Sequence, residues 1–238
     1  MQNKTCLRHI TDCAMTVAMG LLMSYTVTSQ PVHEWLGIGA FALFVLHHLL
    51  NLGWLRALKK GRYTSLRTLQ TVLVTLLFIS VLAQTVSGVA MSRHALPFLN
   101  LPISTSTARL LHLSSTYWSF LLISLRLGFH WGIFLGLGRK KLCGGPPLPF
   151  WGKAILRLAA MGVAAYGLIC FFRQGIPDYL FLRTEFAFFD YSLPPFTVLS
   201  QCVSIFSLWM LVGYLLRKGI QAWDRKVQRH RISKFEMY

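Results

Sequence analysis

A series of apolar runs, each long enough to cross a lipid bilayer, constrains the fold of this chain most. A spanning helix needs about 20 mostly apolar residues. Six segments fit: 11–29, 34–55, 66–91, 108–136, 152–172 and 195–216. The chain is 54% hydrophobic and only 13% charged, which is unlike an ordinary soluble domain. The sequence therefore predicts an all-α integral membrane helical bundle, with about six transmembrane helices in a single domain over residues 1–238.

The positive charge of the chain, formally +17, is distributed unevenly between these segments. Of the 24 Lys and Arg residues, eighteen fall on the predicted side that holds both termini, and four fall on the other side. Cytoplasmic loops of membrane proteins carry an excess of Lys and Arg, so both termini are predicted to be cytoplasmic. Because this asymmetry accounts for the charge, no nucleic-acid partner is predicted. The basic tail 217–238 either contacts anionic membrane lipids or is simply solvated.

Two of the predicted spans carry histidines at matching positions. HEWLGIGAFALFVLHHLLN begins at His33 and has His47 fourteen residues later. HLSSTYWSFLLISLRLGFH begins at His112, has Arg126 fourteen residues later, and has His130 after four more. Fourteen residues turn a helix through about 1400° and rise about 21 Å. Both positions of each pair therefore share one helix face, near opposite sides of the membrane.

This spacing suits b-type haem, which takes one axial histidine from each of two facing helices. His33 and His112 lie at similar depth and form the predicted outer haem site. The inner site is incomplete, because a guanidinium at position 126 has no free lone pair for iron. Two arrangements remain open: His47 pairs with His130, which lies about 6 Å nearer the cytoplasm, or the inner haem is absent or five-coordinate. The chain has no Cys-x-x-Cys-His motif, so covalent c-type haem is not predicted.

Arg126 lies inside a predicted span, where a charge is expected to have a partner. Three interpretations remain open: pairing with Asp12, pairing with a haem propionate, and extension of the side chain to the inner interface. The histidines also have a plainer interpretation as hydrogen-bonded packing residues, and this applies especially to His48. A haem-free membrane transport or assembly subunit, or a one-haem protein without conduction across the membrane, is therefore the alternative function.

Two predicted outer segments flank the outer site. The loop 92–105 contains His94, which is either a plain loop histidine or part of a donor or acceptor surface. The segment 173–195 is aromatic with mixed charge. It is interpreted as an amphipathic surface segment over the mouth of the haem site, or as a docking site for a partner.

Four motifs follow one another in the order found in a bacterial family: VHEWLGIGAFALFVLHHLLN, SGVAMSRHALPF, ARLLHLSSTYWSFLLISLRLGFHW and FFRQGIPDYLFLRTEFAFFDY. With them, from residue 11 to the last span, the chain resembles the flavinylation-associated cytochromes, membrane proteins similar in pattern to di-haem cytochrome b subunits. The resemblance implies haem b in a helical bundle of the bacterial cell membrane. It also implies electron transfer across that membrane, with extracytoplasmic flavin-carrying proteins as partners.

Carried over by position, the resemblance implies His33, His47, His112 and a histidine at position 126 as the haem ligands. This chain reads SLRLGFHW where family members usually read SLHLGLHW, so Arg126 argues against the second haem. The prediction is a b-type cytochrome-like electron-transfer subunit rather than a stand-alone enzyme. It would pass electrons between a quinone or cytoplasmic-side donor and an extracytoplasmic acceptor.

Overall fold

The computed structural model describes residues 2–61, 63–99, 101–142, 149–184, 186–187 and 190–235, and within these the chain is helical without strands. The elements are α1 (Gln2–Met23), the 3₁₀ turn η1 (Tyr25–Val27), α2 (Gln30–Leu50), α3 (Leu52–Ala57), α4 (Ser65–Met91), α5 (Thr105–Leu142), α6 (Phe150–Arg173), α7 (Ile176–Leu180) and α8 (Pro195–Phe235). The all-α prediction is confirmed for these residues.

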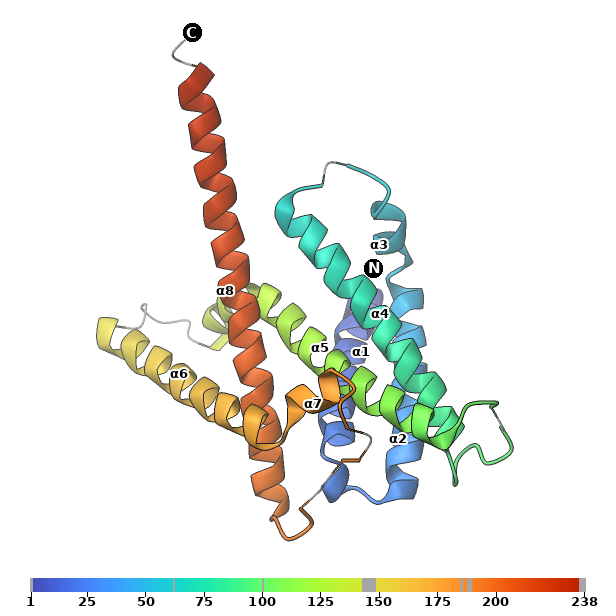
Figure 1. Cartoon of the computed structure of the whole chain (residues 1–238). Coiled ribbons are helices and arrows are strands. Elements are labelled where there is room, and N and C mark those ends of the chain that lie inside the picture. The colour runs from blue at the N-terminus through green and yellow to red at the C-terminus, as the bar shows by residue number, and fades with distance from the viewer. Residues whose placement is uncertain are drawn as a thin grey trace.

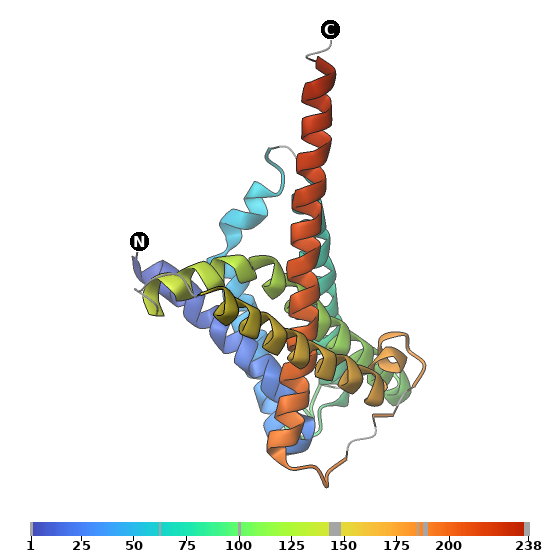
Figure 2. The same cartoon turned by 90° about the vertical axis from the view of Figure 1, so that its left-hand side faces the viewer.

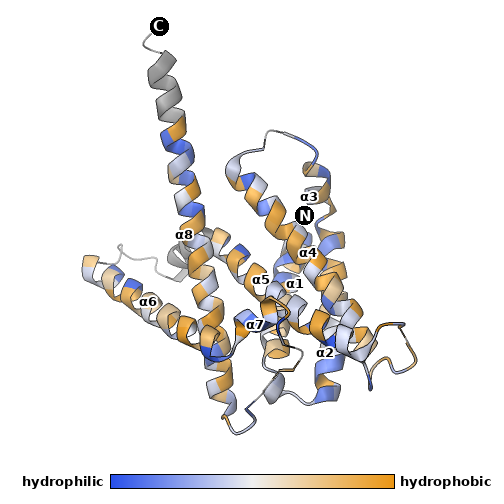
Figure 3. Ribbon diagram, viewed as in Figure 1, coloured by the Kyte–Doolittle hydropathy of each residue, from blue (hydrophilic) through white to orange (hydrophobic). Residues whose placement is uncertain are grey.

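Among the residues that the structure describes, four helices are long and apolar enough to cross a membrane: α2, α4, α6 and the Pro195–Val227 part of α8. They correspond to four of the six predicted spans. The other two, 11–29 and 108–136, fall on or across α1 and α5, and their crossing of the membrane stays a prediction. Figure 3 shows apolar residues along much of the bundle and more polar ones on the distal part of α8.

The ends of three predicted spans differ from the helices that form. The first helix ends at Met23, where the Ser24 hydroxyl donates to the Gly20 carbonyl, and η1 follows. The second predicted span is divided at Asn51, whose side-chain amide donates to the His47 carbonyl at 2.8 Å. The last helix runs on to Phe235 instead of ending near 216, because the charged residues beyond are mostly good helix formers. Its C-terminal end and the N-terminal end of α1 point toward the same end of the molecule (Figures 1 and 2).

The long helix α5 is the centre of the bundle and crosses it obliquely (Figures 1 and 2). One side of α5 contributes Tyr117, Phe120 and Leu121 to the main core. Residues from four other helices complete that core: Met19, Cys170, Phe171, Ile176, Tyr179, Leu180 and Ile205. Another side of α5 packs Leu122 and Phe129 against Leu73 of α4. This central position fixes the depth and direction of the polar residues that α5 carries.

Glycines allow α8 to approach its two neighbours closely. A Cβ at Gly128 of α5 would collide with the Met210 carbonyl of α8, and a Cβ at Gly213 of α8 would collide with the Leu125 carbonyl of α5. Gly167 of α6 faces the Ser204 carbonyl of α8 in the same way. Small residues at such crossings bring helix backbones together in membrane bundles. The α5–α8 and α6–α8 crossings therefore depend on the absence of side chains there.

Helix α2 is held at its two ends and has no buried residue between them. Near its N-terminus the Glu34 carboxylate accepts hydrogen bonds from the loop after α4, from Ser92 Oγ at 2.8 Å, His94 N at 2.8 Å and Ala95 N at 2.9 Å. At its C-terminus the Leu50 carbonyl accepts two hydrogen bonds from the Arg8 guanidinium, at 2.7 and 3.1 Å. These polar contacts connect α2 to α4 and to α1.

Replacing Glu34 with glutamine is expected to loosen the 92–95 loop without unfolding the bundle. The charged acceptor becomes a neutral one, and hydrogen bonds to charged groups are about twice as strong as neutral ones. Amide hydrogen exchange of residues 93–95 should become about tenfold faster. Asp178→Asn, which neutralises an exposed acid 3.7 Å from Arg183, is the matched control and should leave that exchange unchanged. Equal exchange in both variants would show that Glu34 does not hold the loop.

Candidate functional site

The structure brings His33 and His112 face to edge from two helices that are distant in the sequence. Their ring centroids lie 6.4 Å apart with an interplanar angle of 70°. His33 sits in the first turn of α2, and His112 lies two turns into α5. The predicted pairing of these two side chains is therefore present in the geometry.

Helix α4 orients the ring of His112. Its Nδ1 lies 3.1 Å from the Gln84 carbonyl oxygen and 3.3 Å from the Ser87 hydroxyl. Because a carbonyl only accepts, Nδ1 carries the proton when it bonds Gln84, and Nε2 then keeps its lone pair. A Cβ at Gly88 would lie 3.3 Å from Cε1 of the ring, so the glycine lets the imidazole lie close to α4. Metal-binding histidines are commonly fixed in this way through the nitrogen that does not bind the metal.

The surroundings of His33 are different. Its Nδ1 is buried and has no hydrogen-bond partner among the described residues. The ring packs edge-on against Tyr25 of η1, with centroids 5.0 Å apart. Tyr25 in turn interacts electrostatically with Tyr191, so this part of the aromatic outer segment lies near the His33 end of the site.

The first part of the aromatic outer segment packs on another face of α5. Gly175, with φ of 64°, adopts the left-handed conformation that ends α6. In α7, which follows, the Leu180 carbonyl accepts hydrogen bonds from Trp118 Nε1 at 3.1 Å and from Ser114 Oγ at 3.3 Å. Ser114 lies about 200° around α5 from His112, so α7 is a packing element on another face of that helix. Further along the segment, the ring of Phe186 lies 5.2 Å from the Arg109 guanidinium, about one turn before His112.

Further buried polar atoms lie on the His112 face of α5. The hydroxyl oxygens of Thr116 and Ser119 are buried and have no hydrogen-bond partner among the described residues. By helical spacing both lie within about 40° of His112. On α2, a Cβ added at Gly37 or Gly39 would meet nothing within 4 Å, so both glycines border open space. Gly37 lies about 40° around α2 from His33, whereas Gly39 lies on another face of the helix.

The 6.4 Å separation fits both ligation of one metal ion and direct packing of the rings. Imidazole nitrogen binds a first-row metal at about 2.0 Å, so two imidazoles on opposite sides of one iron have centroids about 6 Å apart. Direct edge-to-face packing of two rings covers the same range. Direct packing leaves His33 Nδ1 and the hydroxyls of Thr116 and Ser119 without partners among the described residues, which favours a bound group beside them. The fixed Nδ1 of His112 leaves Nε2 available to such a group.

At the other end of α2, His47 bonds to a carboxylate. Its Nδ1 lies 2.7 Å from Asp12 Oδ1 of α1. A carboxylate on Nδ1 is also a common way of orienting a metal-binding histidine. His48 instead places Nδ1 2.8 Å from the Phe44 carbonyl and packs its ring against Phe44 and Phe78. These contacts favour the packing interpretation of His48.

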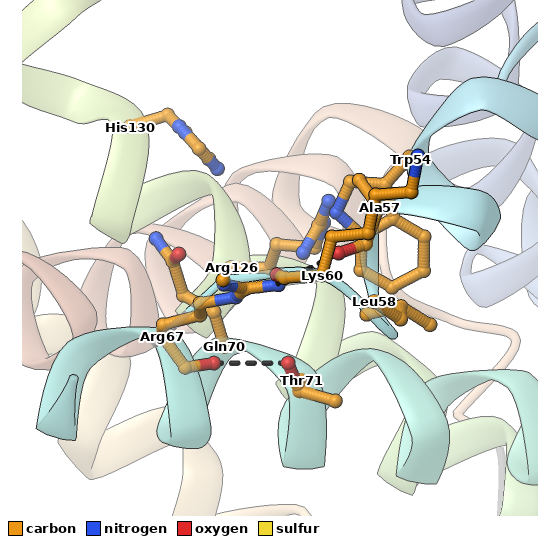
Figure 4. Close-up of a pocket in the computed structure, with 10 residues that line it drawn as sticks. Trp54, Ala57, Leu58, Lys60, Arg67, Gln70, Thr71, Arg126 and His130 are labelled. Atoms are coloured by element: carbon orange, nitrogen blue, oxygen red, sulfur yellow. Dashed lines mark hydrogen bonds between the residues drawn. The ribbon is translucent and has the colours of Figure 1, made fainter. Parts of the chain in front are cut away.

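Arg126 and His130 lie together. Both line a cavity of about 520 Å³ bounded by α3, α4 and α5 (Figure 4). Asp12, which is bonded to His47, also acts electrostatically on Arg126, but no ion pair joins Asp12 and Arg126 among the described residues. Within the same residues, His47 shares no hydrogen bond or ring contact with Arg126 or His130. The rings of the outer histidines are thus in contact, whereas no such contact joins His47 to His130.

The residues that orient the histidines were not identified from the sequence as doing so. They are Gln84 and Ser87 beside His112, and Asp12 beside His47. Glu34, which holds the loop after α4, was likewise not identified. Within the described part of the chain, no group of three or more His, Cys, Asp or Glu side chains is arranged to hold a metal ion. Comparisons with protein-family models, with curated proteins and with solved structures returned no match to this chain.

Proposed function

We propose that this chain is a membrane b-type cytochrome-like electron-transfer subunit, with His33 and His112 as the axial ligands of one haem b. The observation that carries the proposal is the approach of the two imidazoles, 6.4 Å apart, from α2 and α5. Two facing helices that each supply one histidine are the usual source of such ligands in bundles. The bound haem would supply the redox chemistry.

The protein residues around the pair have separate roles in this proposal. The Gln84 carbonyl and Ser87 hold the His112 ring so that Nε2 is presented to the iron. Glu34 attaches the first turn of α2, which carries His33, to the loop after α4. Gly37, one turn after His33 on the same face of α2, borders open space beside the helix. The contacts of Gln84, Ser87 and Glu34 hold the two histidines in place.

The inner end supports a second haem less well. His47 is oriented by Asp12 as a ligand would be, but position 126 supplies a guanidinium, and His130 lies in a different cavity. We therefore propose one haem b at the outer site. Electrons would pass between a quinone or cytoplasmic-side donor and an extracytoplasmic partner such as a flavin-carrying protein. The proposed location is the bacterial cell membrane, with both termini cytoplasmic.

The number of haems per chain tests the proposal directly. The full chain is expressed with ample haem and purified in detergent, and haem b is counted by the pyridine haemochrome spectrum. We expect about one haem per chain. A value near two would mean that the inner site binds haem despite Arg126, with His130 as the suspected ligand. A value near zero would overturn the cytochrome proposal and favour a haem-free transport or assembly subunit.

A further inference from the structure

A cationic cavity lies where α3, the loop after it, α4 and α5 meet. Its volume is about 520 Å³, and its basic lining residues are Lys60, Arg67, Arg126 and His130. Figure 4 shows side chains from the α3 region, from α4 and from α5 surrounding one space, with Arg126 near its centre. No carboxylate is among the lining residues, and none of them belongs to α2.

Its cations differ in what they already bind. The Arg67 guanidinium donates to the Ala57 and Lys60 carbonyls at 2.7 and 2.6 Å and so closes the loop after α3. Lys60 lies exposed at the rim. Arg126 is half-buried, and among the described residues it makes no hydrogen bond or ion pair. The nearest acid that acts on it, Asp12, is bonded to His47.

A half-buried arginine inside an apolar helix is costly unless an anion compensates it. Here a second cation and an imidazole line the same space, which suits a ligand with several anionic oxygens better than a single carboxylate. Two N–H groups of one guanidinium can donate parallel hydrogen bonds to two oxygens of a phosphate. Basic pockets between membrane helices on the cytoplasmic side commonly hold phospholipid headgroups. The cavity lies beside the basic 56–67 segment, on the predicted cytoplasmic side.

We infer that this cavity is a binding site for a phosphate-bearing anion, with Arg126 as the principal contact, Lys60 as a second contact and His130 beside them. The phosphate belongs either to an anionic phospholipid headgroup or to a soluble phosphate. This inference does not depend on haem, because it uses none of the contacts around His33 and His112. In this inference Arg126 binds the phosphate-bearing anion and is not a ligand of haem iron.

The test uses the full chain in nanodiscs of phosphatidylcholine, with or without phosphatidylglycerol. Bound lipid is identified by native mass spectrometry after release from the nanodisc. Wild-type protein should retain phosphatidylglycerol, and Arg126→Gln should lower the retention about tenfold or more. Lys60→Gln should lower the retention of phosphatidylglycerol less than Arg126→Gln does. Because Lys60 is exposed in a loop, its replacement should not disturb folding, and the variant tests the site even if Arg126→Gln fails to fold. Arg157→Gln removes the same charge from an exposed position on α6 and is the matched control.

A second arm distinguishes the source of the phosphate. Inorganic phosphate is added to the protein in phosphatidylcholine nanodiscs, and thermal unfolding is measured. A rise in melting temperature that Arg126→Gln removes would support a soluble phosphate. Retention of phosphatidylglycerol without this rise would support the lipid headgroup. If Arg126→Gln and Lys60→Gln both behave like Arg157→Gln in the two arms, the inference is wrong.

Discussion

Replacing His112 with alanine is expected to abolish haem binding at the outer site while the helical bundle stays assembled. The change removes the imidazole that Gln84 and Ser87 hold in place and that lies against the ring of His33. His33→Ala should have the same effect from the α2 side. The measurement is the haemochrome absorbance per chain, with circular dichroism to verify the helical content.

Two further variants make this test specific. His94→Ala changes an exposed loop histidine near the same end of the molecule and should keep the full haem content. Ser87→Ala removes only a contact to Nδ1 and should weaken haem affinity about 10- to 100-fold, as is typical for groups that orient a ligand. If His112→Ala keeps the absorbance of His94→Ala, the assignment of His112 as a ligand fails.

The second large effect is expected at the α5–α8 crossing. A methyl group at Gly128 would have to occupy the position of the Met210 carbonyl, which belongs to a helix backbone and cannot turn aside. Overpacking costs about 1–3 kcal/mol and occasionally more, and a collision with backbone belongs at the upper end. Gly128→Ala should therefore lower the stability of the bundle by about 3 kcal/mol.

The matched control for Gly128→Ala lies one turn away on the same helix. A Cβ at Gly132 would meet nothing within 4 Å, so Gly132→Ala should be neutral or slightly stabilising. Thermal unfolding in detergent, followed by circular dichroism, compares the two variants. Equal melting temperatures would show that the two helices can separate at this crossing without cost.

The sequence predicts the helices and the outer histidine pair because both depend on periodicity. An apolar run sets the length of a helix, and a step of fourteen residues sets which side chains share a face. This reasoning places His33 and His112 together without any knowledge of the loops. It also places a charge at position 126 within the bundle, where the structure has a half-buried guanidinium.

Other parts of the site leave no such pattern in the sequence. The Gln84 contact to His112 uses a backbone carbonyl, which every residue type has. The Glu34 contacts use backbone amides of a loop, whose course depends on tertiary packing. The positions at which α2 and α8 end depend on local hydrogen bonds and helix propensity, and not on the length of the apolar run. For the same reason, the placement of His130 in a cavity with α3 and α4 could not be predicted from the sequence of α5.

The way in which α2 is held has a consequence for how the protein is assembled. Polar contacts join α2 to its neighbours at Glu34 and at Leu50, and no residue between them is buried. These contacts form within the polypeptide, so the helical arrangement can be complete before any other molecule binds. A haem bound as proposed would then be loaded sideways from the lipid, past the exposed side of α2, without release of either end. Its insertion would be a late step that follows membrane insertion of the chain and leaves these polar contacts intact.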